Sequence, residues 1–543
     1  MVYRHIALAA FAAAAPLSAA AQSNLPAPIE AQELRALDAW SVSALSRNDG
    51  ALAADLWSRS DPETLVLAFD KIPAQFNSAA TQALALRVLL SGGDAPRGDA
   101  SGAARKRFEA LGRLGQADAL ATMAAGAGAA LSDPQIATYA AQAELARLRR
   151  RDACTRGRGA AIGEEPAPFL FRLRAYCAAA DGDRAAADLA LELSRAASAD
   201  DTWYSAAVSA VGGAAPARAP AARYDNSLAA QLSIAAAFQP GPNPLNNAST
   251  LALVTIARNE TAPQPHRAQA AALAYRRGAL NAAQAREILL ATPAEITSAL
   301  PPIVTALREV EAMRAGVSAG PEAEGVATLE RGRAIARALA AATNPADFAA
   351  VAAFFKDDIA ALSAAPDQAA SLLFARAAIA AGDAQLAQRL VASVRQAGVD
   401  NAALGPLDAA LAALAGARGE AGLRAIHRRI DAGGGPAAAR DVAILAALGA
   451  ETDGQAQRFL LATAPRGGAR ADSGAMLALA NAVERGATGE AALLAVGALG
   501  EGGPAALDAE SLERVIRALR ALRLEQDARR IAAEAILAGA PAQ

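Results

Sequence analysis

Long segments of helix-forming residues alternate along the chain with short polar turns that contain glycine or proline. Alanine dominates the long segments and strand-favouring runs of β-branched residues are scarce, so nearly every long segment is predicted to be helical. Two predicted helices begin alike, with Ser60-Asp61-Pro62-Glu63 and with Ser132-Asp133-Pro134-Gln135. A serine N-cap, a proline just inside it and Glu or Gln three residues on are typical of a helix start. The distance between the two starts equals two units of about 36 residues, which indicates a repeat.

Prolines that are predicted to begin helices recur at a similar spacing. The first series consists of Pro62, Pro96, Pro134 and Pro166, and the second of Pro366, Pro406, Pro436 and Pro504. Most neighbouring members are one unit apart, and Pro436 and Pro504 are two units apart. A unit of about 34 residues is typical of arrays of helix pairs.

The turn inside each predicted helix pair has a pattern of its own. A glycine is followed five residues later by an alanine. The glycine is predicted to end the first helix in the left-handed conformation, and the alanine is small enough to let the second helix pack closely. The pairs are Gly182 with Ala187, Gly278 with Ala283, Gly382 with Ala387, Gly416 with Ala421, and Gly486 with Ala491; Arg523 takes the glycine position before Ala528.

At these glycine and small-residue positions the chain resembles the tetratricopeptide repeat family. The bulky aromatic positions of that family are mostly Ala or Leu here, so the resemblance concerns architecture and transfers no binding residue. It implies an all-α fold, an α-solenoid of stacked antiparallel helix pairs with a period of about 34 residues. Such arrays present a concave surface that binds peptides or proteins.

Loops rich in proline and glycine interrupt the period in the middle of the chain and suggest four segments. We expect a signal peptide at 1–21, N-terminal helical repeats at 22–210, an irregular helical middle at 211–325 and C-terminal repeats at 326–543. The middle still contains three predicted helices, at 251–258, 267–277 and 282–291.

The N-terminus has the pattern of a secretory signal. Arg4 and His5 precede an apolar stretch from Ile6 to Leu17, and small residues follow up to a predicted cleavage site after Ala21. The apolar stretch is too short to span a bilayer, and no later stretch is long enough. We therefore expect an exported, periplasmic or secreted protein with no transmembrane segment after cleavage.

Cys154 and Cys177 are the only cysteines of the chain. In an exported protein two cysteines are a candidate pair. The predicted hairpins place Cys154 near the start of one helix and Cys177 near the end of the next, which are neighbouring ends in an antiparallel pair. We expect a structural disulfide, with two unpaired buried thiols as the alternative.

Charge excludes one class of partner and suggests another. The chain has 52 basic and 54 acidic residues, a net charge of −2, so it lacks the basic balance of a nucleic-acid-binding protein. Four arginines nevertheless cluster: Arg147, Arg149, Arg150 and Arg151. They are interpreted either as cations at a helix C-terminus, which the helix dipole favours, or as a contact for an anionic glycan or acidic peptide.

The sequence contains one pattern that is typical of an enzyme. The segment 316–320 reads Gly-Val-Ser-Ala-Gly, the Gly-x-Ser-x-Gly of a hydrolase nucleophile, and His427 follows, with Asp357, Asp358 or Asp383 between them. Such a serine needs a strand before it, whereas 303–315 is predicted to be helical. We expect no catalysis and keep a hydrolase using Ser318 as the alternative. The histidines have no metal-ligand spacing and no phosphate-binding loop occurs, so no cofactor or metal is expected.

The favoured interpretation is an exported scaffold that binds a protein or peptide partner and catalyses nothing. The alternative is the superhelical part of a system that processes cell-wall peptidoglycan, because the long alanine-rich array resembles the helical domain of soluble lytic transglycosylases. That alternative implies association with the cell wall. A third possibility is a structural spacer with no specific ligand.

Overall fold

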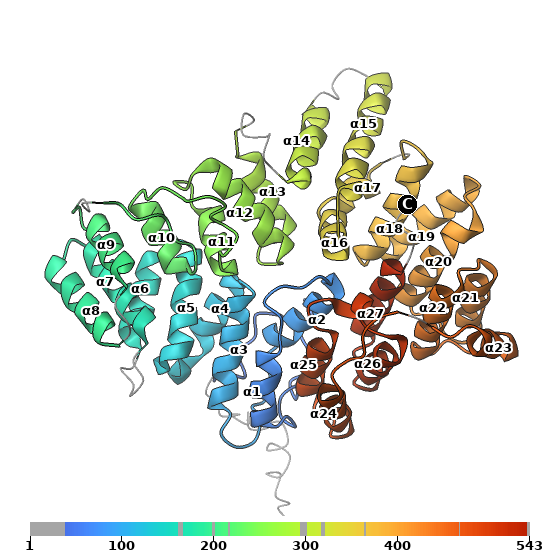
Figure 1. Ribbon diagram of the computed structural model, residues 1–543, viewed down its shortest axis with the longest axis horizontal. Coiled ribbons are helices and arrows are strands. Elements are labelled where there is room, and N and C mark those ends of the chain that lie inside the picture. Colours follow the sequence, from blue (N-terminus) through green and yellow to red (C-terminus); the bar gives the residue numbers. More distant parts are fainter. Residues whose placement is uncertain are drawn as a thin grey trace, which may run out of the picture. The chain divides into compact units, whose positions relative to one another are not determined.

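A computed structural model describes residues 38–543, apart from gaps at 161–166, 198–200, 215–217, 294–300, 316–320, 363–364, 466 and 540–543. The described residues form 27 α-helices (Figure 1) and contain no strand, only two isolated β-bridges. The predicted signal peptide and the residues up to 37 lie outside the described residues. The all-α fold class predicted from the sequence is confirmed.

The helices follow one another at short intervals along the whole chain. Those of the first part are α1 (Pro62–Asp70), α2 (Ala79–Leu90), α3 (Ser101–Arg113), α4 (Ala117–Gly126), α5 (Pro134–Ala146), α6 (Arg150–Gly159), α7 (Pro168–Ala180), α8 (Arg184–Ala197) and α9 (Thr202–Val211). The middle helices are α10 (Ser227–Ala235), α11 (Thr250–Arg258), α12 (Gln264–Arg276), α13 (Ala282–Leu290), α14 (Pro302–Ala315) and α15 (Pro321–Ala340). The last are α16 (Pro345–Phe354), α17 (Lys356–Ala360), α18 (Gln368–Ala380), α19 (Ala384–Gln396), α20 (Asn401–Ala415), α21 (Gly419–Asp431), α22 (Gly435–Ala447), α23 (Gly454–Ala462), α24 (Ser473–Glu484), α25 (Thr488–Leu499), α26 (Ala509–Ala521) and α27 (Glu525–Ala538).

Consecutive helices pack against each other as pairs, as a solenoid requires. The pairs with the most extensive contact include α5 with α6, α7 with α8, α11 with α12, α18 with α19 and α24 with α25. The three helices predicted in the middle are present as α11, α12 and α13. The principal hydrophobic core takes residues from the N-terminal, middle and C-terminal parts, among them Leu84, Leu253 and Leu493.

The predicted turns inside the helix pairs are confirmed at four positions. Gly182, Gly382 and Gly486 have φ of 84°, 75° and 67°, and Arg523 adopts the same left-handed conformation with φ of 61°. The alanines five residues after them, Ala187, Ala387, Ala491 and Ala528, are buried. Gly278 and Gly416 are left-handed too, but Ala283 and Ala421 after them are exposed, so the small-residue prediction is wrong at these two turns.

The two repeated helix starts are capped one residue later than predicted. Asp61 and Asp133, not the serines before them, are the N-caps, and their carboxylates accept bonds from backbone N–H groups of the first turn. The reason is the proline that follows each of them. Proline is favoured at the first helical position, so the residue immediately before it becomes the cap and stays extended.

The proline series marks only some helix starts. Pro62, Pro134 and Pro436 lie in the first two positions of α1, α5 and α22, and Pro504 is the second residue of a 3-10 turn at Gly503–Ala506. Pro406 lies inside α20, so the predicted start there is wrong. Two others, Pro96 and Pro366, lie in the loops before α3 and α18, and Pro166 lies outside the described residues.

Helices from the two ends of the described chain lie side by side, blue α1 and α2 next to red α25 and α27 in Figure 1. We call this contact the terminal seam and define it by two hydrogen-bonded pairs of residues. The backbone N–H of Asp61 donates to Glu490 Oε2 at 2.8 Å, and that of Ala80 donates to Glu534 Oε2 at 2.8 Å. The described helices therefore form a solenoid whose first and last helices are joined.

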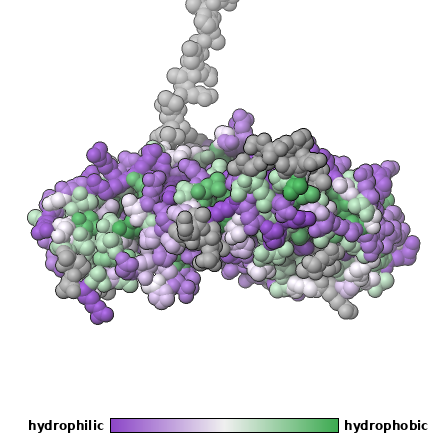
Figure 2. Space-filling view, turned by 90° about the horizontal axis from the view of Figure 1, so that it is seen from above, coloured by the Kyte–Doolittle hydropathy of each residue, from purple (hydrophilic) through white to green (hydrophobic). Residues whose placement is uncertain are grey.

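The surface mixes apolar and polar residues. On the face in Figure 2 the hydrophobic patches are small and separated by hydrophilic residues. Over the part of the chain that the structure describes, no helix combines the length and the apolar character needed to cross a membrane.

Candidate functional site

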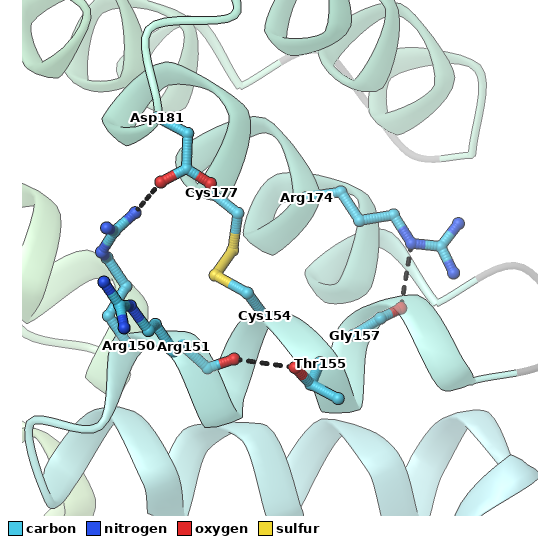
Figure 3. The surroundings of a disulfide bond; sticks show 8 residues. All are labelled: Arg150, Arg151, Cys154, Thr155, Gly157, Arg174, Cys177 and Asp181. Atoms are coloured by element: carbon cyan, nitrogen blue, oxygen red, sulfur yellow. Dashed lines mark hydrogen bonds and ion pairs between the residues drawn. A yellow bond between two sulfur atoms is a disulfide. The ribbon is translucent and has the colours of Figure 1, made fainter.

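A disulfide joins α6 to α7, as predicted from the two cysteines. Cys154 lies in the second turn of α6 and Cys177 near the end of α7, with their Cα atoms 6.0 Å apart (Figure 3). Both residues are buried in a satellite core that contains Leu173 and Trp203. The antiparallel packing of α6 on α7 is what brings these two positions together.

Polar contacts hold α6 against α7 on either side of the disulfide (Figure 3). At the start of α6, Arg150 Nη1 lies 2.6 Å from Asp181 Oδ1, just beyond the end of α7. At the end of α6, Arg174 of α7 donates from Nε to the backbone carbonyl of Gly157 at 2.9 Å. One covalent and two polar connections therefore fix the position of α6.

The four predicted arginines lie at the junction between α5 and α6. Arg147 caps the C-terminus of α5, where the helix dipole favours a cation. Arg149 is the N-cap of α6, and Arg150 and Arg151 are its first two residues. These three lie at a helix start, where the dipole disfavours a cation, so a dipole explanation holds for Arg147 alone.

Two of these arginines have close acidic partners. Arg147 Nη1 lies 3.0 Å from the buried carboxylate of Glu144, and its Nε lies 3.2 Å from Asp118. Arg150 pairs with Asp181, and this ion pair holds the pKa of the Asp181 carboxyl below its ordinary value.

The remaining two arginines are more accessible. The Arg149 side chain is 57% exposed, and its ion pair with Asp152 is long, at 3.8 Å. Arg151 is exposed as well. We call the surface formed by Arg149 and Arg151 at the start of α6 the α6 arginine face. The dipole and both side chains have the same sign, and Asp152 offsets the charge of one of the two arginines, so the face has a net positive charge.

The residues considered for catalysis do not converge in the described structure. Ser318 lies outside the described residues. His427 Nε2 lies 3.0 Å from Asp453 Oδ2, and Asp453 is not one of the aspartates predicted from the sequence. Asp453 is also the N-cap of α23, and the backbone N–H of Ala456 is the largest of several influences that lower its pKa.

The three candidate aspartates lie in a buried ion-pair cluster or at helix starts. Asp358 is buried and pairs with Arg286 and Arg314, whereas Asp383 caps the N-terminus of α19. Asp357 lies in the first turn of α17, where a carboxylate is favoured by the dipole.

A pocket that the sequence did not indicate lies among the C-terminal helices. It has a volume of about 420 Å³ and is lined by residues of α15, α16, α18, α20 and α27. Most of the lining is apolar, including Leu339, Phe348 and Leu407, and Arg376 is its one cationic side chain. Its lining residues are spread from Leu339 to Ala538, and no local sequence pattern connects positions so far apart.

Comparisons with models of known protein families, with curated proteins and with solved structures found no match to this chain.

Proposed function

We propose that this protein is an exported, periplasmic or secreted α-solenoid of the tetratricopeptide-like type that binds a partner protein and catalyses nothing. The stacking of consecutive helix pairs supports a scaffold, because such arrays expose one face of many helices to a partner. The terminal seam supports it further, since joining the first and last helices limits the flexing of the array and lowers the entropic cost of binding.

The α6 arginine face is the observation that carries this proposal. Arg149 and Arg151 are exposed, whereas the helix that presents them is fixed by the disulfide and by the contacts of Arg150 and Arg174. A cationic surface on a fixed helix is suited to an acidic segment of a partner, because guanidinium groups bind carboxylates with charge-assisted hydrogen bonds.

Site-specific photocrosslinking in cells tests this function. A photoreactive residue replaces the exposed Thr155, one turn after Arg151, and in a control strain the exposed Gln457 on α23. We expect a defined protein adduct from position 155 and none from position 457. The double variant Arg149→Glu, Arg151→Glu reverses the charge of the face, and the adduct should fall at least several-fold.

Arg424→Glu is the matched control, because Arg424 is an exposed arginine whose ion pair is with Glu420 in the same helix. This variant should leave the adduct unchanged. An equal loss in both variants, or no adduct at position 155, contradicts the proposal.

The α6 arginine face also suits the carboxylates of an anionic cell-wall glycan, which is the alternative function. Purified peptidoglycan sacculi are sedimented with the protein, and hydrolysis is followed by zymography on the same material. Cosedimentation that the Arg149→Glu, Arg151→Glu variant loses would favour cell-wall association over a protein partner. Clearing on the zymogram would contradict the absence of catalysis.

A further inference from the structure

The pocket among α15, α16, α18, α20 and α27 has the size and the lining of a small-molecule site. Its volume of about 420 Å³ lies in the range of about 300 to 1,000 Å³ that is usual for ligand pockets. Such pockets combine a mostly apolar wall with a few polar groups that orient the ligand. Here the apolar wall comes from residues such as Leu339, Leu372, Leu407 and Leu537.

Arg376 is the one cationic group in the lining of this pocket. Its Nη2 donates to the backbone carbonyl of Leu537 at 3.1 Å, and its guanidinium lies 5.4 Å from the centre of the Phe348 ring. Within the described residues no carboxylate lies within ion-pair distance of it. A guanidinium has five N–H donors, and within the described residues none of those of Arg376 meets a carboxylate.

Some buried or partly buried arginines in the described structure have carboxylate partners, whereas others, such as Arg277 and Arg440, bond backbone carbonyls as Arg376 does; Arg376 differs from these two in that it lines the pocket. Arg286 has two carboxylate partners, Glu311 and Asp358, and Arg87 pairs with Asp527 at 2.5 Å. Partial burial also lowers the pKa of Arg376, and no acidic group counteracts this effect. A partly buried cation without a counter-ion is stabilised when a ligand brings a negative charge next to it, so this pocket favours an anionic ligand.

Glu534 is the one acidic residue that lines the pocket, and its carboxylate already has a partner. Its Oε2 accepts the backbone N–H of Ala80 at 2.8 Å, at the start of α2. Its burial also favours the uncharged form, which raises its pKa. The charge that remains to be matched in the pocket is therefore positive.

We propose that this pocket binds a small amphipathic carboxylic acid, with its carboxylate on Arg376 and its apolar body against Leu339, Leu372 and Leu407. This ligand is separate from the protein partner proposed above, because the pocket and the α6 arginine face lie on different helices. The pocket accepts an acyl chain because the wall is apolar, and it orients that chain because only one of its ends meets a cation.

Isothermal titration of the full mature chain with decanoate tests the proposal. Decanol and decyltrimethylammonium are titrated in parallel, below their aggregation limits, because they share the chain and differ in the head group. We expect decanoate to bind and the other two to bind at least tenfold more weakly. Since a charge-assisted hydrogen bond contributes about 1.5 to 3 kcal/mol, Arg376→Leu should weaken decanoate by about tenfold to a hundredfold.

Three further variants separate the pocket from general effects. Arg376→Lys keeps the charge and should retain part of the affinity. Ala403→Phe places a ring in the pocket wall and should abolish binding while Arg376 is intact. Arg389→Leu removes an exposed arginine from the neighbouring helix α19 and should leave binding unchanged.

Each variant is first compared with the wild type by its circular dichroism spectrum and thermal midpoint, so that misfolded protein is not titrated. No binding of decanoate to the folded wild type overturns the proposal. Equal binding of decanoate and decanol, or decanoate binding that Arg376→Leu leaves unchanged, overturns it as well. Preferred binding of decyltrimethylammonium overturns it too, and would instead assign the pocket to a cationic ligand facing Glu534.

Discussion

Several buried arginines in this protein hold loops and helix ends together through backbone carbonyls. Arg107 is fully buried and donates to the carbonyls of five residues in the segment before α1 and at the end of α2. Arg440 is also buried, and donates to the carbonyls of Pro504, Leu507 and Ala535. A guanidinium suits this role because its five donors form a fixed planar fork.

Arg107→Met should therefore destabilise the protein strongly. The substitution fills much of the same space but leaves five buried carbonyl groups without this donor, so we expect a loss of about 3 kcal/mol in the free energy of unfolding. Urea denaturation followed by tryptophan fluorescence reports this region, because Trp40 and Trp57 lie beside Arg107.

The matched control is Arg105→Met on the same helix. The Arg105 side chain is 38% exposed and its ion pair with Asp133 is 3.8 Å long, so its loss should change stability by less than about 0.5 kcal/mol. Similar losses for the two variants would contradict the role assigned to the carbonyl contacts of Arg107.

At the scale of the element, the turn inside a helix pair decides how closely the two helices pack. Residues other than glycine in the left-handed conformation are strained, and two such turns have Leu148 with φ of 60° and Arg523 with φ of 61°. The sequence pattern found the turn at Arg523 from its spacing, but missed the one at Leu148, because leucine gives no signal for a left-handed residue. Ala153, five residues after Leu148, is buried, as are the alanines five residues after the turns at Gly182, Gly382, Gly486 and Arg523.

Arg523→Gly should stabilise the pair formed by α26 and α27. Arg523 is exposed, so little packing is lost, and removing the left-handed strain should raise the free energy of unfolding by about 0.5 to 1 kcal/mol. Arg514→Gly, in the middle of α26 with a 63% exposed side chain, is the control and should lower it by about 1 kcal/mol. Thermal midpoints measured side by side should therefore move in opposite directions.

The pair formed by α6 and α7 depends on its disulfide as well as on packing. Replacing both Cys154 and Cys177 by serine opens a loop that spans 23 positions, and the closure entropy of such a loop corresponds to about 3 kcal/mol. We expect the double variant to have a lower thermal midpoint than the wild type. Dithiothreitol should lower the thermal midpoint of the wild type to the value of the double variant. Two reactive thiols in unfolded, unreduced wild type would show that the bond does not form.

The sequence predicted these elements well because their signals are local. Glycine turns, helix caps and the pairing of the two cysteines each depend on residues within about one helix pair of each other. The predicted caps were shifted by one residue at Ser60 and Ser132, because the proline that fixes the first helical turn outweighed the capping-box pattern. The positions of the prolines were less reliable, since Pro406 is accommodated inside α20.

At the scale of the whole molecule, the first and last described helices are joined by contacts that the sequence could not indicate. Asp61 and Glu490 are separated by 429 positions, and Ala80 and Glu534 by 454. A repeat period predicts which neighbouring helices stack, but it contains no information on whether the first helices meet the last. The same limit applies to the pocket around Arg376, whose walls come from five helices.

The terminal seam contains a carboxylate whose charge works against folding, and this makes its pH dependence testable. Glu534 accepts the N–H of Ala80 at the start of α2, where the helix dipole favours an anion. Burial has the larger effect, so the pKa of Glu534 is raised. The folded protein then holds this proton more tightly than the unfolded chain, and the stabilisation from it is lost as the pH rises through the raised pKa.

Glu534→Gln should therefore become more stable relative to the wild type as the pH rises from about 5 to about 8. Glutamine keeps an oxygen that accepts the Ala80 N–H but has no proton to lose, whereas Glu534→Ala removes the acceptor and should cost about 1 to 3 kcal/mol at every pH. Thermal midpoints of the three proteins across this range measure the effect, with the exposed Glu510→Gln as the control that shows no trend. If instead the thermal midpoint of the wild type rises relative to that of Glu534→Gln as the pH rises, the helix dipole outweighs burial. The charge of Glu534 itself would then hold the two ends of the solenoid together.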